Sequence, residues 1–217
     1  MDPDFWHTRW AANQIGFHQQ TTNNYLQQFW RAPVEGNRIL VPLCGKSLDM
    51  HWLRQQGYAI AGIEVSPLAI EAFFAEAGLN PSRHDAPNHS RWSVDGIDLY
   101  CGDFFTLTAA EIGTVDAFYD RAALVAMPAH LRPAYVEHLV ELLPSHANGL
   151  LVTMEYEQSY MDGPPFSVPP AEVQALLGTA FTLEHLQVAD ILDAQPAFRE
   201  RGLERLKEHV FRLTRKC

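Results

Sequence analysis

The chain has 217 residues, 47% of them hydrophobic, and a formal net charge of −10 at pH 7. This composition predicts a packed globular protein, and the negative charge argues against a general nucleic-acid binder because the phosphate backbone attracts positive surface. No apolar run approaches the roughly 18 residues that cross a bilayer, and the acidic, aromatic N-terminus is unlike a secretory signal, so we expect no membrane association.

Two helices are predicted before the first strand. Apolar side chains recur at helical spacing over residues 5–16. Residues 22–32 have a similar pattern, with Thr22 or Asn23 able to cap the helix. Residues 33–36 (PVEG) then break the chain ahead of the first strand.

The most informative stretch is a strand, turn, helix, strand unit. An apolar strand at about 38–43 ends in a tight turn at 44–47 (CGKS). Ser47 is a suitable N-cap for the helix that follows, and a second strand at 58–65 carries Glu64 near its end. In doubly wound sheets such an acid hydrogen-bonds the hydroxyls of a ribose, while the first turn approaches the rest of the nucleotide. The unit therefore predicts a site for an adenosine-containing cofactor.

Strands and helices continue to alternate through the rest of the chain. Ser66-Pro67 opens a helix that stops at Gly78, and the polar, turn-rich residues 80–96 indicate an exposed excursion without regular structure. The elements expected beyond it are strands at 97–101, 115–119 and 149–154, helices at 130–143 and 170–178, a Pro-rich loop at 159–170, and final strands at 181–189 and 208–214. This order predicts a parallel sheet with helices on both faces and an antiparallel hairpin at its end.

Side chains at the carboxyl ends of the strands form a candidate ligand site, because ligands of open parallel sheets bind there. Gly45 lets the backbone approach a cofactor, and Glu64 is placed to hold its ribose. Asp103 and Phe104 can flank an adenine ring, and Arg121 can orient a cofactor carboxylate or an anionic substrate. The plainer alternatives are a turn glycine, solvated acids, a core aromatic ring, and an ion pair of Arg121 with the acid before it.

Four further residues near this site allow two interpretations each. Cys44 is either a nucleophile or, with no base nearby in the sequence, a small residue that fills the turn. Lys46 either meets a cofactor carboxylate or lies at the surface. Trp6 and Trp10 are either core residues of a terminal helix or indoles that close over a bound ligand. The three cysteines are too few for a disulfide framework and have no zinc spacing, so we expect a reducing cytoplasm and no metal site.

The first turn also indicates which cofactor is bound. A dinucleotide site favours GxGxxG, and this turn has a single glycine; the GxxxxGK[ST] phosphate loop is absent as well. The remaining common choice for this architecture is S-adenosylmethionine, which has ribose hydroxyls and no phosphate.

The chain resembles the thiopurine S-methyltransferase family, and specifically its bacterial branch. The PLCGK string at 42–46 and the DRAALVA string at 120–126 are the most specific motifs. The other matching segments are Trp6-x-x-x-Trp10, Gly16-Phe17-His18-Gln19, Gly62-Ile63-Glu64-Val65-Ser66, Leu99-Tyr100-Cys101 and Gly163-Pro164-Pro165-Phe166. They follow the family order over nearly the whole chain.

The resemblance implies a Rossmann-like α/β methyltransferase of class I. Its sheet would have seven mostly parallel strands with one antiparallel strand and helices on both faces. The whole chain, 1–217, would form a single domain, with residues 1–35 as a helical lid and 36–217 as the Rossmann-like core. S-adenosylmethionine contacts are implied for Trp10, Leu43, Glu64 and Arg121, in the turn that also holds Cys44 and Gly45, with Asp103-Phe104 near the adenine. A second substrate-side arginine falls at Arg201, with Arg199 as the alternative.

The activity implied is methyl transfer to the sulfur of aromatic or heterocyclic thiols such as thiopurines, in a protein that acts as a monomer. We expect Arg121 and Arg201 to favour an anionic substrate. Selenium and tellurium species are an alternative acceptor class, since a soft nucleophile suits the same site. Two other interpretations remain open at this point: a small-molecule methyltransferase that acts on a halide or phenol, and a non-catalytic adenosine-binding module.

Overall fold

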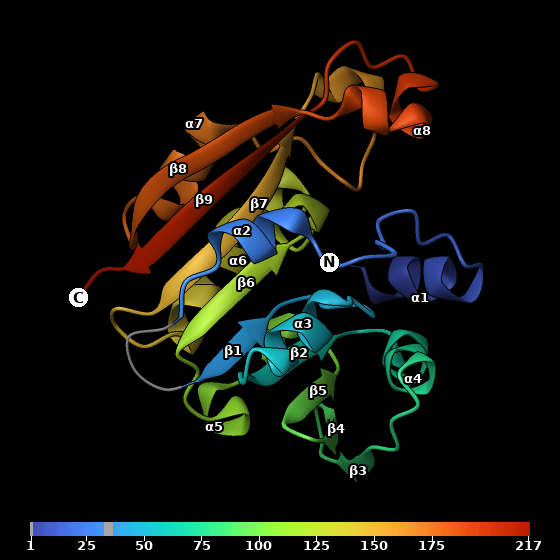
Figure 1. The fold of residues 1–217 in the computed structure, drawn as a ribbon, viewed down its shortest axis with the longest axis vertical. Coiled ribbons are helices and arrows are strands. Elements are labelled where there is room, and N and C mark those ends of the chain that lie inside the picture. Colours follow the sequence, from blue (N-terminus) through green and yellow to red (C-terminus); the bar gives the residue numbers. More distant parts are fainter. Residues whose placement is uncertain (1, 33–36) are drawn as a thin grey trace.

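The computed structural model describes residues 2–32 and 37–217, in which a nine-stranded sheet carries helices on both faces (Figure 1). The helices are α1 Pro3–Ala11, α2 Asn24–Phe29, α3 Asp49–Gln55, α4 Pro67–Glu76, α5 Ala109–Ile112, α6 Arg132–Leu142, α7 Pro170–Leu177 and α8 Pro196–Arg199. The strands are β1 Arg38–Val41, β2 Ala59–Glu64, β3 Ser82–Asp85, β4 Ser90–Val94, β5 Ile97–Cys101, β6 Ala117–Arg121, β7 Asn148–Glu155, β8 Phe181–Asp190 and β9 Lys207–Arg215. The break expected at 33–36 lies outside the described residues.

The strand order is β3-β4-β5-β2-β1-β6-β7-β9-β8. Strands β5, β2, β1, β6 and β7 pair in parallel, and β9 runs antiparallel to both of its neighbours, β7 and β8. The seven strands from β5 to β8 therefore form a mostly parallel sheet with one antiparallel strand, which confirms the predicted fold class. The carboxyl ends of the parallel strands meet at one edge, where the ligand site of such sheets lies.

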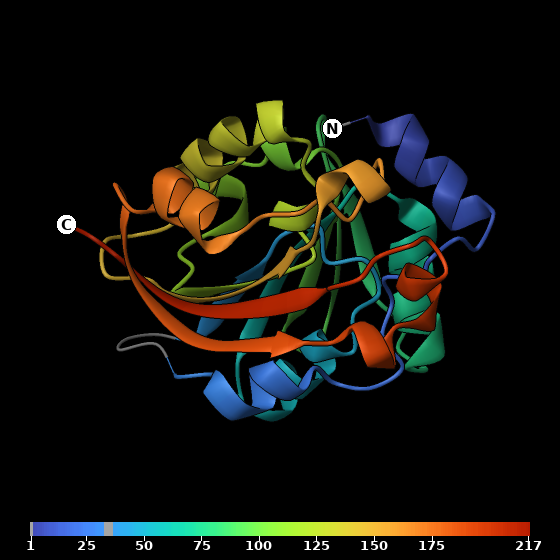
Figure 2. The ribbon, with the colours of Figure 1, turned by 90° about the horizontal axis from the view of Figure 1, so that it is seen from above.

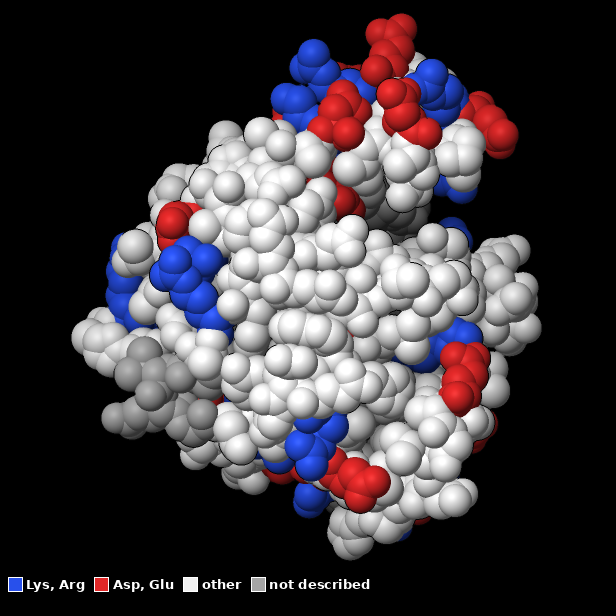
Figure 3. Space-filling model, viewed as in Figure 1, with Lys and Arg blue, Asp and Glu red and all other residues white. Residues whose placement is uncertain are grey.

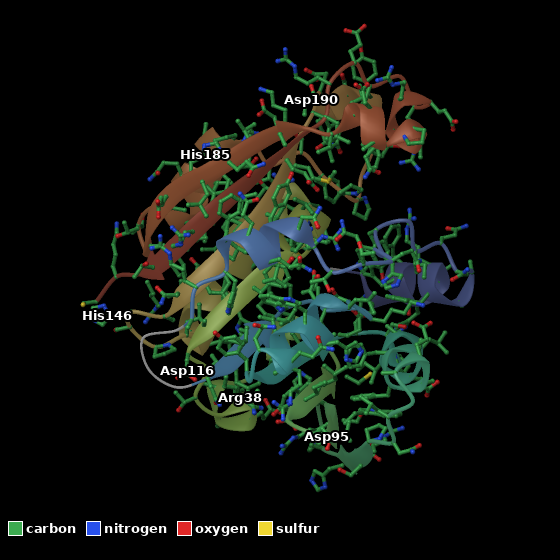
Figure 4. All side chains as sticks on the ribbon, in the orientation of Figure 1. Arg38, Asp95, Asp116, His146, His185 and Asp190 are labelled. Atoms are coloured by element: carbon green, nitrogen blue, oxygen red, sulfur yellow. The ribbon has the colours of Figure 1, made fainter. Side chains whose placement is uncertain are left out.

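The count of seven strands was wrong for the whole sheet, because β3 and β4 extend it beyond β5. Residues 80–96 were expected to be an excursion without regular structure, yet β4 pairs antiparallel with β5, with Val94 opposite Ile97. The two residues between them, Asp95 and Gly96, both have positive φ (Figure 4 labels Asp95). An Asp-Gly pair is the preferred sequence of a two-residue hairpin turn, so the missed signal is local and lies in the turn.

Alternation of side chains along the strands builds a core on each face of the sheet. In β1, Leu40 packs into one core, while Ile39 and Val41 pack into the other. Helices α5, α6 and α7 cover the first face, and α2, α3 and α4 cover the second (Figure 2). Among the described residues, no helix is long and apolar enough to span a bilayer.

A buried carboxylate fastens the N-terminal segment to the sheet. Asp49, in the first turn of α3, accepts hydrogen bonds from the backbone N–H of Asn23 (2.7 Å) and from the Tyr119 hydroxyl on β6 (3.0 Å). Asn23 itself caps α2 by accepting from the N–H groups of Tyr25 and Leu26, as one of the two predicted caps. One side chain thus joins α2, α3 and the central sheet.

Removing this carboxylate is expected to destabilise the fold. Asp49→Ala leaves two buried donors without partners, so we expect the free energy of unfolding to fall by about 3 kcal/mol. Urea denaturation followed by circular dichroism measures the change. Asp193→Ala, which removes only an exposed acid, is the control and should stay within about 0.5 kcal/mol of wild type. Equal effects of the two substitutions would contradict this role for Asp49.

Candidate functional site

One cavity of about 430 Å³ lies at the carboxyl ends of the parallel strands. Three parts of the chain line it: the N-terminal segment, the strand ends, and the region from the Pro-rich loop to β9. Figure 3 shows charged side chains gathered over the region of α8, above a hollow in the surface. The lining residues used below are Trp6, Trp10, Phe17, His18, Leu43, Gly45, Glu64, Arg121, Ala122, Val125, Ala126, Met154, Pro164, Pro165, Phe198, Arg201 and Glu208.

The turn after β1 is built in a left-handed backbone conformation. Leu43 has φ of 47° and Gly45 has φ of 51°. A Cβ added at Gly45 would stand 3.2 Å from the Trp10 ring, which is tighter than ordinary van der Waals contact. The glycine is therefore needed both for the turn and for the approach of Trp10, so it is more than a turn residue.

Glu64 closes the end of β2 with a buried carboxylate. Its two oxygens accept from the backbone N–H of Gly45 (3.0 Å) and from that of Ser66 (2.8 Å). Burial raises the pKa of Glu64 to about 6, and these backbone hydrogen bonds oppose the rise. The alternative of a solvated acid is therefore wrong. The carboxylate is held in place with free lone pairs facing the cavity it lines.

Arg121 ends β6 and reaches toward the N-terminal segment. Its guanidinium donates to the carbonyl of Phe17 at 3.4 Å. Asp120 faces the opposite way and accepts from the Tyr135 hydroxyl (2.7 Å) and from two backbone N–H groups, while burial raises its pKa to about 6. The considered ion pair of Arg121 with Asp120 is absent from the described residues. Arg121 is therefore available to the cavity.

Three aromatic rings cover the cavity from the N-terminal side. Trp6 and Trp10 each meet the Phe17 ring edge-on, at 5.7 Å between ring centroids. The imidazole of His7 lies 3.1 Å from the carbonyl of Val65, just beyond β2. The indoles therefore do not pack into either core of the sheet, and they form one wall of the cavity.

The comparisons with known proteins agree with this geometry. The family model described as "Thiopurine S-methyltransferase (TPMT)" matches residues 1–216. The chain belongs to the thiopurine S-methyltransferase family. Relatives named thiopurine S-methyltransferase include one from Pseudomonas fluorescens, 47% identical over 98% of this chain and 99% of its own length, and one from Xanthomonas campestris, 48% identical over 99% and 100%. The predicted family is thus confirmed.

Solved structures agree in fold. A SAM-dependent methyltransferase from Anabaena variabilis is 13% identical, with a TM-score of 0.65, and the match covers 99% of this chain and 95% of that one. Another from Methanosarcina mazei has a TM-score of 0.62 at 15% identity, covering 89% and 98%. The protein is an S-adenosylmethionine-dependent methyltransferase, as its family membership and fold indicate.

The residues present fit S-adenosylmethionine. Ligand cavities commonly measure 300–1,000 Å³, and this one falls in that range. Gly45 keeps the turn after β1 free of a side chain beside the Trp10 ring, and the Glu64 carboxylate offers acceptors suited to ribose hydroxyls. Trp10, Leu43, Gly45, Glu64 and Arg121, all expected to contact the cofactor, come together in the one cavity.

Asp103 and Phe104 line a small pocket that shares Leu43 and Glu64 with the main cavity. Asp103 accepts from the N–H of Phe105 and so caps a short turn. The Phe104 ring is buried against Tyr135, with ring centroids 5.0 Å apart. Phe104 is therefore a core aromatic that also lines this small pocket, and contact of the pair with adenine stays a prediction.

The structure does not bring the side chains of Cys44 and Lys46 into the cavity. Cys44 is buried in the core, and burial raises the pKa of its thiol, which argues against a nucleophile. Lys46 pairs with Glu76 at 2.5 Å. Among the residues described, no group of His, Cys, Asp or Glu is arranged to hold a metal ion.

The structure also separates the two candidate arginines near the C-terminus. Arg201 lines the cavity, where it lies over the Phe198 ring at 5.9 Å from the centroid and donates to the Met161 sulfur at 3.6 Å. Arg199 is exposed and pairs with Asp193. The geometry therefore favours Arg201 over Arg199.

Sequence reasoning missed Glu208 and His18 as cavity residues. Glu208 lies on β9 opposite Met154 of β7, and both line the cavity. Only the register of the β7–β9 pair places this acid at the cavity, and the register cannot be derived from the sequence pattern. His18 lies within a quoted family motif, so its signal was present; burial and nearby Lys46 lower its pKa.

Glu64 is expected to make cofactor binding depend on pH. Because its pKa of about 6 is above the ordinary value, ionised Glu64 lowers the stability of the folded protein above that pH. We expect the same ionised form to supply the acceptors for ribose. We expect the affinity for S-adenosylhomocysteine to fall as the pH drops below about 6, approaching tenfold per unit. Isothermal titration calorimetry from pH 7.5 to 5 measures this.

Glu64→Gln should weaken binding at pH 7.5 and flatten the pH profile. Glu137→Gln, an exposed acid on α6, is the matched control and should retain the wild-type profile. An unchanged profile in Glu64→Gln would rule out this acid as the source of the dependence.

Proposed function

We propose that the protein transfers the methyl group of S-adenosylmethionine to the sulfur of aromatic or heterocyclic thiols of the thiopurine type. The observation that carries the proposal is the main cavity, which has cofactor-type groups at the β1–β2 end and two arginines with aromatic rings beside them. The names of the bacterial relatives, thiopurine S-methyltransferase, support the same acceptor.

The chemistry asks little of the protein beyond alignment and charge. When bound, the cofactor supplies an electrophilic methyl group on a sulfonium. An aromatic thiol has a low pKa and is partly thiolate at neutral pH, so the positive charges of Arg121 and Arg201 favour its reactive form. Holding the sulfur in near-attack geometry contributes several kcal/mol to lowering the barrier.

The N-terminal segment is proposed to act as a lid over this reaction. Trp6, Trp10 and Phe17 wall the cavity and exclude water, and the Phe17 carbonyl is held by Arg121. The proposed lid consists of residues 1–35, and the proposed core consists of residues 36–217; the two belong to one domain. The boundary between them lies outside the described residues. A monomeric, cytoplasmic protein without nucleic-acid partners stays a prediction.

Acceptor specificity tests the proposal directly. Labelled S-adenosylmethionine is incubated with 6-mercaptopurine, a phenol, an amine and selenite, and the methylated products are counted. We expect transfer to the thiol and none to the phenol or amine. Transfer to selenite would add the metalloid class, which otherwise stays a prediction. Transfer to the phenol alone, or to no acceptor while the cofactor binds, would overturn the proposed function.

Arg201 and Arg199 form a matched pair for testing the substrate-side charge. Arg201→Ala should lower kcat/KM for an anionic thiol by about 10- to 100-fold, because a charge-assisted contact is lost. Arg199→Ala removes an exposed charge and should leave kcat/KM within about twofold. Steady-state kinetics with both variants decide between them, and the reverse order would assign the role to Arg199.

A further inference from the structure

We propose that Glu208 selects heterocyclic thiones, in which an N–H group adjoins the C=S carbon, and that its carboxylate accepts the proton of that N–H as sulfur is methylated. The inference rests on the proposed function and deepens it by naming a subclass of acceptor. The residue and its role are not implied by the arginine and cofactor assignments above.

Its place in the sheet puts Glu208 at the end of the cavity away from Glu64. From β2 to β9 the strand order is β2-β1-β6-β7-β9, so four strand spacings separate the two acids. At about 4.8 Å per spacing this is roughly 19 Å. Arg121, on β6, lies between them. Glu208 is thus remote from the acid suited to ribose, and it lies in the cavity wall beside Met154, its partner across the β7–β9 pair.

The surroundings of Glu208 are suited to a base. Desolvation raises the pKa of this carboxyl, while the charge of Arg121 and a hydrogen bond with the Tyr25 hydroxyl of α2 lower it. None of the ion pairs within 4 Å in the described part of the chain includes Glu208. The carboxylate therefore faces the cavity with a long-range positive neighbour and without a direct cationic partner.

An ionised carboxylate only accepts hydrogen bonds, so it recognises N–H and not a bare ring nitrogen. A thiopurine in its thione form carries an N–H beside C=S. As the sulfur forms its bond to the methyl carbon, the bond from that carbon to the sulfonium sulfur breaks. The N–H electron pair becomes the ring C=N bond and the proton passes to the Glu208 carboxylate, then to water. A thiophenol has no such N–H and gains nothing from Glu208.

The selection follows from the cost of an unpaired buried group. Sites built to pair with a substrate N–H discriminate strongly against analogues that lack it. Arg121 and Arg201 favour negative charge on sulfur, whether on a thiolate or on the polarised C=S of a thione, so they do not separate a thione heterocycle from a simple aromatic thiol. Glu208 supplies the missing distinction, and it does so through a group that touches the substrate.

The test compares 6-mercaptopurine with 4-nitrothiophenol in wild type, Glu208→Gln and Glu208→Asp. In Glu208→Gln we expect kcat/KM for 6-mercaptopurine to fall by about 30-fold or more, and that for 4-nitrothiophenol to change by less than about threefold. The acidic limb of the 6-mercaptopurine pH profile should move in the same variant. Glu208→Asp should recover part of the loss, and Glu204→Gln, an exposed acid before β9, should behave as wild type.

Equal losses for both acceptors would show a structural or electrostatic role and overturn the proposal, as would no loss for either. Equilibrium binding of the two acceptors in the presence of S-adenosylhomocysteine gives a readout that needs no turnover. If wild type methylates neither thiol, the proposed function fails, while a loss of 6-mercaptopurine binding confined to Glu208→Gln would still support N–H recognition. Because glutamine keeps an oxygen that accepts N–H, the deciding binding comparison uses Glu208→Leu; equal binding of 6-mercaptopurine by wild type and Glu208→Leu would overturn that recognition.

Discussion

The site depends on one buried carboxylate. Glu64 accepts from the N–H of Gly45 and from that of Ser66, so a single side chain joins the turn after β1 to the start of α4. Without it, two backbone donors at adjacent strand ends would lose their partners. The turn after β1 then places Gly45 against the Trp10 ring, and this ring packs edge-on against Phe17. The cofactor end of the cavity is thus held by a sequence of contacts that starts at Glu64.

The cavity is assembled from both ends of the chain around this fixed point. Its N-terminal wall is attached to the sheet through Asp49 and through the contact of Arg121 with the Phe17 carbonyl. Its other wall comes from Phe198 on α8, Arg201 in the turn after α8, and Glu208 on β9. In the proposed function, the central strands hold the cofactor and the more peripheral β7 and β9 hold the acceptor. One cavity can in this way recognise two chemically different molecules.

The sequence predicted the parts of this arrangement that are local. The unit from β1 to β2 and the position of Glu64 follow from apolar runs, a tight turn and an acid at a strand end. The sheet class follows from alternation. The strands β3 and β4 were missed because their residues are mostly polar; the pair Asp95-Gly96 signals only the turn from β4 into β5. Glu208 was missed for another reason. Its place depends on the pairing of β9 with β7, and the paired residues are more than fifty positions apart in the sequence.

Two residues of the cavity wall, Leu43 and Ala122, have left-handed backbones without being glycine, with φ of 47° and 75°. Valine, isoleucine and threonine are the residues least suited to that conformation. Substitutions to these branched residues are therefore disfavoured at both positions by the backbone conformation, even where the cavity has space for the side chain. Val125 and Ala126 lie in a right-handed 3-10 turn of the cavity wall. Larger or smaller side chains at these two positions would change the cavity volume without straining the backbone.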